Sequence, residues 1–290
     1  MTTPAPVRIV DTHVHLWDPA REDWYPYLSA GQAGLGMGDV SGMARRFDLA
    51  DYSSEATEWN IEKIVNVAAA THWHSVDETL ELQRRADEGR GPDAIIGGLP
   101  FTDSRYAAVA ALDRQCSANR FRGVRPMGPY PGPLPDDDVL RVLAERGLVY
   151  EMMTHPDQLV TAARGLQIHD QLLVVVEHTG WPRDDSAEER NMWRQGMSAL
   201  ADAGPNVMCK LSGLAMPLGS MDADVFAPWL EFAIETFGVD RCCFGSNFPV
   251  DGLHGTLSQL WRAYSTVTAG LSDESRDKLF ATNAERIYRC

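Results

Sequence analysis

The stretch LLVVVEHTG, residues 172–180, joins five consecutive apolar residues to an acid and a histidine. A strand that is buried on both faces reads as a continuous run of Val, Ile and Leu, which is typical of a parallel sheet covered by helices. The polar residues follow the apolar run at the point where such a strand would end. The stretch therefore predicts a buried parallel strand that carries polar side chains at its carboxyl end.

Seven other stretches have a similar character, and amphipathic helical patterns separate most of them. The expected strands cover residues 7–15, 63–70, 94–101, 121–127, 148–153, 207–214 and 241–250. Eight strands that alternate with helices in 290 residues favour a single (β/α)8 TIM barrel, one domain over residues 1–290, with long βα loops at 16–47 and 126–135. The alternative, an open doubly wound sheet, would place a glycine-rich phosphate loop after its first strand, and DTHVHLWD is no such loop.

The composition of the chain disfavours some classes of binding partner. The chain carries 41 acidic and 26 basic residues, a net charge of -15, which disfavours nucleic acid and anionic membrane surfaces. Its first residues, MTTPAPVRIV, do not resemble a signal peptide, and its longest apolar run is too short to span a bilayer. Its five cysteines lack CxxC spacing and are expected to be reduced thiols. We expect a cytoplasmic protein that acts on a small molecule, and a homo-oligomer is compatible with the sequence.

Polar side chains gather at the carboxyl ends of most of the expected strands. These ends converge on one cavity in a barrel, where catalytic groups are found. A single strand-end histidine would be more typical of a hydrogen-bonded core residue. Polar residues on five or six strands are harder to explain by packing, because burying them costs free energy. The set comprises His13, His15, Arg125, Glu151, His155, His178, Lys210, Ser212, Asn247 and Asp251.

Five motifs, in this order along the chain, resemble the amidohydrolase-related family: DTHVHLWDP, FRGVRPM, VVVEHTGWP, KLSGL and FGSNFPV. The likeness is greatest to the branch that hydrolyses sugar lactones and pyrone lactones, and it runs from Asp11 to about Arg286. It implies an enzyme that opens a small cyclic ester, with cyclisation or isomerisation as the reverse direction. The alternatives are a metal-dependent decarboxylase of the same superfamily and a catalytically altered relative that acts as a binding protein.

The resemblance also implies roles for single residues. His13 and His15 match the first-strand pair that binds a metal or the substrate carbonyl, and His178 matches the histidine that completes this cluster. The cofactor is then either none or one divalent metal ion, with zinc as the expected metal. Arg125 matches an arginine that holds a substrate carboxylate or hydroxyl, and Lys210 matches a strand-seven lysine common in this branch.

The eighth strand departs from the family pattern. The family has GSD there, whereas this chain has GSNFPV with Asn247 in the place of the aspartate that serves as general base or metal ligand. An amide accepts no proton at neutral pH and is a poor metal ligand beside a carboxylate. Either Asp251 supplies the carboxylate, or Glu151, His155 or His178 acts as base, or the reaction is not ordinary hydrolysis. Asp251 is equally suited to cap the following helix.

Two further expectations concern neighbouring side chains. Because His178 is expected to point into the barrel, strand alternation sends Glu177 away from the barrel centre. Aromatic residues in the first long loop are expected either to wall the pocket and contact a ring substrate or to pack the loop. These are Trp17, Trp24, Tyr25 and Tyr27, of which Trp17 is the candidate for substrate binding. Glu151 and His155 are further candidates for substrate contacts.

Overall fold

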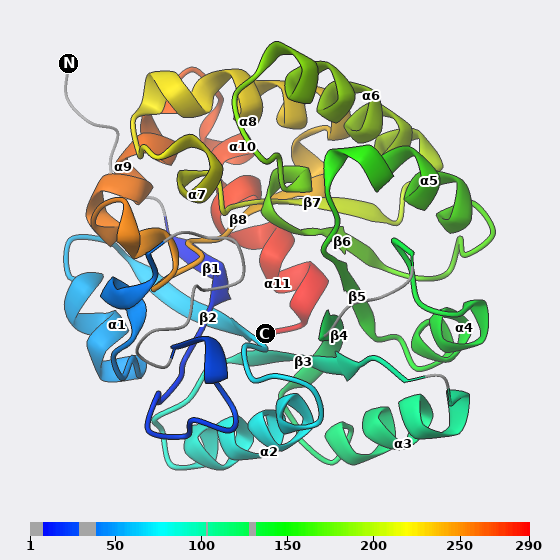
Figure 1. The fold of residues 1–290 in the computed structure, drawn as a ribbon. Coiled ribbons are helices and arrows are strands. Elements are labelled where there is room, and N and C mark those ends of the chain that lie inside the picture. The colour runs from blue at the N-terminus through cyan, green and yellow to red at the C-terminus, as the bar shows by residue number, and fades with distance from the viewer. Residues whose placement is uncertain (1–7, 29–38, 103, 128–131) are drawn as a thin grey trace.

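The computed structural model describes residues 8–28, 39–102, 104–127 and 132–290. Eight strands form one sheet in sequence order, and every neighbouring pair is parallel. A parallel bridge between Val14 and Phe248 joins the ends of the sheet. Helices surround this ring (Figure 1), so the predicted TIM barrel is confirmed. The strands are β1 (Ile9–Val14), β2 (Ile61–Val67), β3 (Ala94–Pro100), β4 (Phe121–Met127), β5 (Val149–Met152), β6 (Val174–Val176), β7 (Val207–Leu211) and β8 (Cys242–Phe244).

Helices follow the strands and begin at residues that suit helix starts. Asp48 and Thr256 form capping boxes with the third residue of α1 and α9, and serines cap α3 and α6. The helices are α1 (Leu49–Glu55), α2 (His74–Asp87), α3 (Arg105–Gln115), α4 (Asp137–Glu145), α5 (Pro156–Leu166), α6 (Ala187–Ala203), α7 (Ala215–Leu218), α8 (Ala223–Phe237), α9 (Leu257–Val267), α10 (Asp273–Asp277) and α11 (Asn283–Tyr288).

Two layers of apolar side chains hold the barrel together. Along β6, Val175 belongs to the cluster inside the barrel, whereas Val174 and Val176 belong to the larger cluster between strands and helices. The last helix fills the inner layer from the amino ends of the strands, because Ile287 and Tyr288 pack in the same inner cluster. Figure 1 shows α11 in the middle of the ring. The inner cluster leaves the carboxyl ends of the strands for polar residues.

Ion pairs join the C-terminal helices α10 and α11 to the first two strands and the residue before them. Arg8, just before β1, contacts Asp277 and Glu285, each at 2.9 Å. Lys63 of β2 contacts Glu285 at 2.6 Å and donates to the backbone oxygen of Cys290 at 2.8 Å. The first two strands therefore hold the C-terminal residues of the chain in place.

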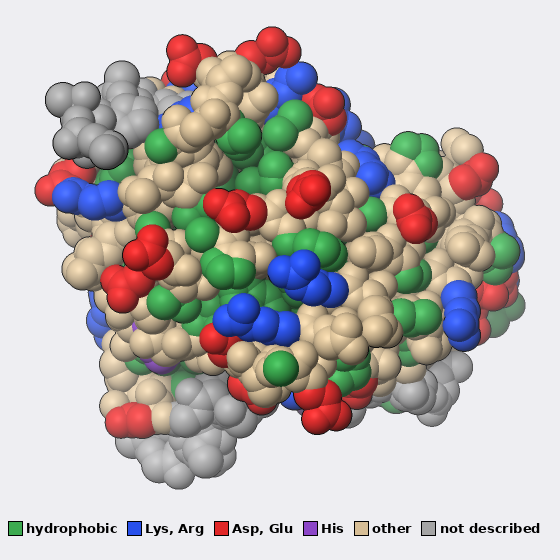
Figure 2. Space-filling model, turned by 90° about the horizontal axis from the view of Figure 1, so that it is seen from above, with side chains coloured by type: hydrophobic (Ala, Val, Ile, Leu, Met, Phe, Trp, Pro, Cys, Tyr) green, Lys and Arg blue, Asp and Glu red, His purple; other side chains and the backbone are tan. Residues whose placement is uncertain are grey.

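The surface mixes charges of both signs. Figure 2 shows a face on which Asp and Glu side chains lie among Lys and Arg side chains and neutral groups. None of the helices in the described parts of the chain is both long enough and apolar enough to cross a membrane. The cytoplasmic location, the oligomeric state and the single domain over residues 1–290 stay predictions.

Replacing Ile287 with alanine tests the packing of α11 into the barrel. The side chain is 1% exposed, and removing such a buried group costs about 2–5 kcal/mol of unfolding free energy. Ile168, which is 71% exposed, is the matched control, and Ile168→Ala should change stability by no more than about 0.5 kcal/mol. Urea unfolding of both variants measures the difference. Equal losses would show that α11 adds little to the core.

Candidate active site

A buried carboxylate joins the ends of the first and last strands. Asp11 Oδ1 accepts hydrogen bonds from the backbone N–H groups of His13 at 3.1 Å and Ser246 at 2.7 Å. Its Oδ2 accepts from the Tyr52 hydroxyl at 2.7 Å. All three donors hold Asp11 from different elements, so its carboxylate sets the relative position of the two chain segments that carry His13 and Asn247.

The two histidines of the HxH motif lie side by side. The register of β1 shifts between Asp11 and Val14, and the Nε2 atoms of His13 and His15 are 3.2 Å apart. His15 Nδ1 donates to the carbonyl of Val67 on β2 at 2.8 Å. The structure therefore brings this predicted pair together at the carboxyl end of the barrel, with both rings buried.

The chain turns with a left-handed twist directly after β6. The backbone angle φ lies between 42° and 75° at all four residues of 178–181, a conformation that costs roughly 1–2 kcal/mol for each residue with a side chain. The indole of Trp193 donates to Thr179 O at 2.6 Å, and Thr179 Oγ1 donates to Ser212 O at 3.3 Å. A Cβ at Gly213 would lie 2.4 Å from the His178 ring, so the glycine leaves room for it.

Because of this turn, the expectation that Glu177 points away from the barrel centre is wrong. Val175 faces the interior, and alternation by two places Glu177 on the same side. The expectation assumes that side chains alternate regularly through His178, but the positive φ of 51° at His178 breaks this alternation. Both residues consequently reach one cluster of side chains with His13, and the ring centroids of His178 and His13 are 4.5 Å apart. Counting from the apolar run would have found Glu177 in the sequence.

Glu177 is a buried carboxylate without a hydrogen-bond partner for either oxygen among the described residues. Its Oε2 lies 3.7 Å from His178 Nε2 and 3.8 Å from Arg125 Nη1. Burial raises the pKa of Glu177 to about 8; the charge of Arg125 opposes this shift and that of Glu151 adds to it. The group can therefore both accept and release a proton near neutral pH.

Arg125, on β4, presents unused donors to the same place. Its Nη2 donates to Met153 Sδ at 2.9 Å, and its Nε has no partner within the described part of the chain. A thioether is a weak acceptor. The guanidinium thus has donors available for an oxygen-rich ligand, and the predicted contact with substrate stays a prediction.

Lys210 and Glu151 are not placed for the predicted contacts with substrate. Both side chains are fully buried, and Lys210 Nζ donates to the two carboxylate oxygens of Glu151 at 2.7 and 2.6 Å. The Tyr288 hydroxyl donates to the same carboxylate at 2.6 Å, and Lys210 Nζ lies 3.4 Å from His13 Nδ1. The ion pair therefore contacts His13 from inside the barrel.

Asn247 and Asp251 form a pair behind His15. Asn247 has a φ of 57°, and its Nδ2 donates to Asp251 Oδ1 at 2.8 Å. Asp251 is fully buried, and the cap of α9 is Thr256, so Asp251 does not cap that helix. The expected helix cap is therefore not found, and a catalytic role of Asp251 stays a prediction. Burial raises the pKa of Asp251 to about 7, against the hydrogen bond from Asn247.

The remaining two candidates occupy different positions. Trp17 is 1% exposed and stacks on His15 at 5.7 Å between ring centroids, so it packs behind the histidine and offers no free face to a substrate. His155 is half-buried; its Nδ1 lies 3.0 Å from Trp181 O. Trp181 in turn contacts His178, with 5.7 Å between ring centroids. His155 therefore lies one residue away from the histidine cluster.

The three clustered histidines are neutral at physiological pH. Burial is the main cause that lowers the pKa of His13 and His178 well below the usual range, and nearby Lys210 and Arg125 lower it further. Burial likewise lowers the pKa of His15 to about 3, against hydrogen bonds with Val67 and Asn247. Neutral imidazoles can donate one hydrogen bond and accept another.

One group of described residues could hold a metal ion. Ligand atoms of His13, Glu177 and His178 lie within 4.8 Å of one another. Two histidines and a carboxylate are a common set for catalytic zinc, and the carboxylate has no other partner. The set differs from the predicted one, because Glu177 takes the place of His15.

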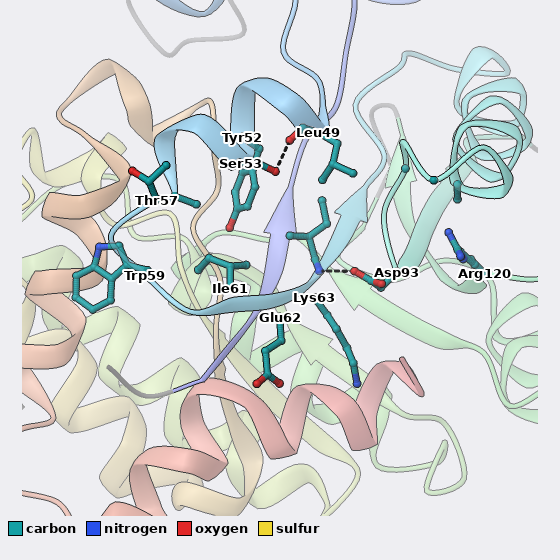
Figure 3. Close-up of a pocket in the computed structure, with 15 residues that line it drawn as sticks. Leu49, Tyr52, Ser53, Thr57, Trp59, Ile61, Glu62, Lys63, Asp93 and Arg120 are labelled. Carbon is teal, nitrogen blue, oxygen red and sulfur yellow. Dashed lines mark hydrogen bonds between the residues drawn. The ribbon is translucent and has the colours of Figure 1, made fainter. Parts of the chain in front are cut away.

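A hollow of about 500 Å³ lies elsewhere, beside α1 and the amino end of β2 (Figure 3). Its charged side chains are engaged within the protein: Lys63 binds Glu285, Glu62 lies 3.4 Å from Arg8, and Arg120 donates to Pro92 O at 3.1 Å. The hollow is therefore not part of the cluster at the carboxyl ends of the strands.

Comparisons with known proteins agree with this arrangement. A family model described as Amidohydrolase matches residues 10–290. The uncharacterized protein y4mH of Sinorhizobium fredii is 32% identical over 98% of this chain and 99% of its own length. An L-fucono-1,5-lactonase of Burkholderia ambifaria is 27% identical over 97% of this chain and 95% of its own length.

A solved structure shares the fold over nearly the full length. An amidohydrolase from Burkholderia multivorans with bound zinc has a TM-score of 0.80 and 24% identity, over 97% of this chain and 99% of that chain. The family model and the full-length relative cover the strands that carry the whole histidine cluster. The chain therefore belongs to the amidohydrolase family, and it is a hydrolase.

Proposed function

We propose that this hydrolase opens a lactone, and that its substrate is a neutral, polyhydroxylated ring of the sugar-lactone kind. The observation that carries the proposal is the cluster of His13, Arg125 and Glu177, in which a hydrogen-bond donor, a guanidinium and a partnerless carboxylate converge. The lactonase relative from Burkholderia ambifaria supports the reaction class.

Each residue of the cluster has a task in ester hydrolysis. His13 and Arg125 donate hydrogen bonds to the lactone carbonyl and ring oxygens, which stabilises the oxyanion by about 10²–10³ in rate per donor. Glu177 takes a proton from a water molecule while the oxygen of that water attacks the carbonyl carbon. The tetrahedral intermediate then breaks its ring C–O bond, and Glu177 returns the proton to the leaving alkoxide, which gives a hydroxy acid.

The charges near the cluster favour a neutral ring over a dicarboxylated pyrone. Lys210 is balanced by Glu151, and Arg125 faces Glu177. Residues 29–38 and 128–131, outside the described part, contain no Lys or Arg. One guanidinium shared with a carboxylate suits hydroxyl groups or a single negative charge, whereas two carboxylates would require further cations.

The alternative activity, metal-dependent decarboxylation, has less support. It would require a firmly bound ion with an acidic ligand from the eighth strand, and that position is Asn247, whose amide binds Asp251. No feature of the described site favours it over hydrolysis.

A lactone panel tests the reaction and the substrate class together. We expect ring opening of neutral aldonolactones, followed by the acid released in a weakly buffered pH-indicator assay. A dicarboxylated pyrone should be hydrolysed far more slowly. Decarboxylation of an aromatic acid, without hydrolysis of any lactone, would contradict the proposal.

Replacing Glu177 with glutamine tests the proposed base. General acid–base assistance is worth about 10²–10⁴, so kcat should fall by that factor with little loss of stability, because the carboxylate has no hydrogen bond to lose. Wild-type kcat/KM should rise with pH until about pH 8, where Glu177 is ionised, and the variant should lack this rise.

Asp251→Asn is the control for this experiment, because Asp251 is buried behind Asn247 and its amide can still accept the hydrogen bond. It should keep most of the activity. If Asp251→Asn loses its activity while Glu177→Gln keeps normal turnover, the general base is Asp251, after the eighth strand, and not Glu177.

Arg125→Lys keeps the charge and removes the planar fork. We expect KM for the lactone to rise more than kcat falls, as when substrate binding is weakened uniformly. Arg122 lies on the same strand and binds the backbone oxygens of Asn119 and Arg289, so Arg122→Lys should leave KM unchanged. If Arg125→Lys lowers kcat alone, the guanidinium acts in the transition state.

A further inference from the structure

A one-way chain of hydrogen bonds runs beneath the site. Lys210 Nζ lies 3.4 Å from His13 Nδ1, His13 Nε2 lies 3.2 Å from His15 Nε2, and His15 Nδ1 lies 2.8 Å from Val67 O. An ammonium only donates and a carbonyl only accepts. Since each neutral imidazole has one donor and one acceptor nitrogen, the two ends assign every proton: His13 carries its proton on Nε2, and His15 carries its proton on Nδ1.

The ammonium at the start of this chain is held firmly. Lys210 donates to both oxygens of Glu151 at 2.7 and 2.6 Å, and Tyr288 donates to the same carboxylate at 2.6 Å. Lys210 Nζ also lies 5.4 Å from the centroid of the Tyr288 ring. All three side chains are buried, so none exchanges its partner for water without opening the barrel interior.

This arrangement decides what His13 can bind. A metal ligand must offer a lone pair, and a metal-bound histidine usually donates its other N–H to a carboxylate or carbonyl. In His13 the lone pair of Nδ1 faces Lys210 and Nε2 carries the proton. We propose that Lys210 fixes His13 in the tautomer with its proton on Nε2, the nitrogen that faces His15, and keeps this imidazole from binding a metal ion.

The proposal has a consequence for the metal group described above. With His13 engaged, that group keeps only Glu177 and His178 as ligands, fewer than the three protein ligands of a catalytic zinc site. Removing the ammonium frees Nδ1 of His13 to carry the proton and leaves the lone pair on Nε2. Lys210 is thus a positioning residue for His13, and its loss should increase the affinity for metal.

Zinc affinity of Lys210→Met tests this inference. Competition with a chromophoric chelator measures the zinc Kd of the wild-type protein and the variant. We expect roughly 10–100-fold tighter binding in the variant, the usual size of effects from residues behind a metal ligand. Adding His13→Ala to Lys210→Met should abolish the gain. Equal zinc affinity in wild type and Lys210→Met would overturn the proposal.

Lys63→Met is the matched control, because it removes a lysine that pairs with Glu285 at the amino end of the barrel. Its zinc affinity should equal that of the wild type. A gain like that of Lys210→Met would mean that any lost lysine raises zinc binding, and the proposal would fail.

A second measurement decides the matter if Lys210→Met does not fold, since it leaves Glu151 buried without its cation. Nitrogen-15 NMR of the wild-type protein with labelled histidines reports which ring nitrogen carries the proton, and His13→Gln identifies the signal. We expect a protonated Nε2 and a bare Nδ1. A protonated Nδ1 would refute the assignment. Neither measurement uses a lactone, so the result is independent of the proposed function.

Discussion

The hydrogen bonds to Asp11 are the constraint on which the site depends. One carboxylate oxygen accepts the backbone N–H groups of His13 and Ser246, which lie at the ends of the first and last strands. A parallel barrel must close between these two strands, and the histidine pair sits at that seam. Because Asp11 is fully buried and Tyr52 binds its second oxygen, losing the carboxylate would both loosen the closure and leave buried donors unpaired. The same hydrogen bonds of Asp11 thus close the barrel and position His13.

The left-handed turn after β6 contributes the other half of the site at a local cost. Positive φ angles at residues 178–181 are unfavourable for side chains with a Cβ, and the hydrogen bonds of Thr179 with Trp193 and Ser212 offset part of that cost. Because of this turn, two consecutive residues, Glu177 and His178, point into one cluster with His13, which a regular strand forbids. Such strain is typical of functional positions, where the surrounding structure holds a conformation that the segment alone would avoid.

The fold could be predicted from the sequence because one pattern, an apolar run followed by a helical pattern, is repeated along the chain. Each apolar run predicts one strand, and few architectures contain eight such strands. The site could be predicted in outline, since polar residues at strand ends converge in any barrel. The depth of each side chain in the barrel and the direction in which it points could not be predicted. Lys210 and Glu151 lie on strands at the predicted places, but nothing in the sequence says that they pair with each other inside the barrel. The direction of the Glu177 side chain could not be predicted by counting strand alternation from His178, because His178 has a positive φ and is not part of the regular strand.

The replacement of aspartate by Asn247 is consistent with the acid four residues later. Asn247 donates through Nδ2 to Asp251, which is fully buried and whose second oxygen lacks a partner among the described residues. An aspartate at position 247 would remove this donor and place two carboxylates side by side in a region that already raises the pKa of Asp251 to about 7. One carboxylate would have to stay protonated and could not serve as base. An amide avoids that conflict, and the base is then sought in Glu177, the buried carboxylate beside His13 and Arg125.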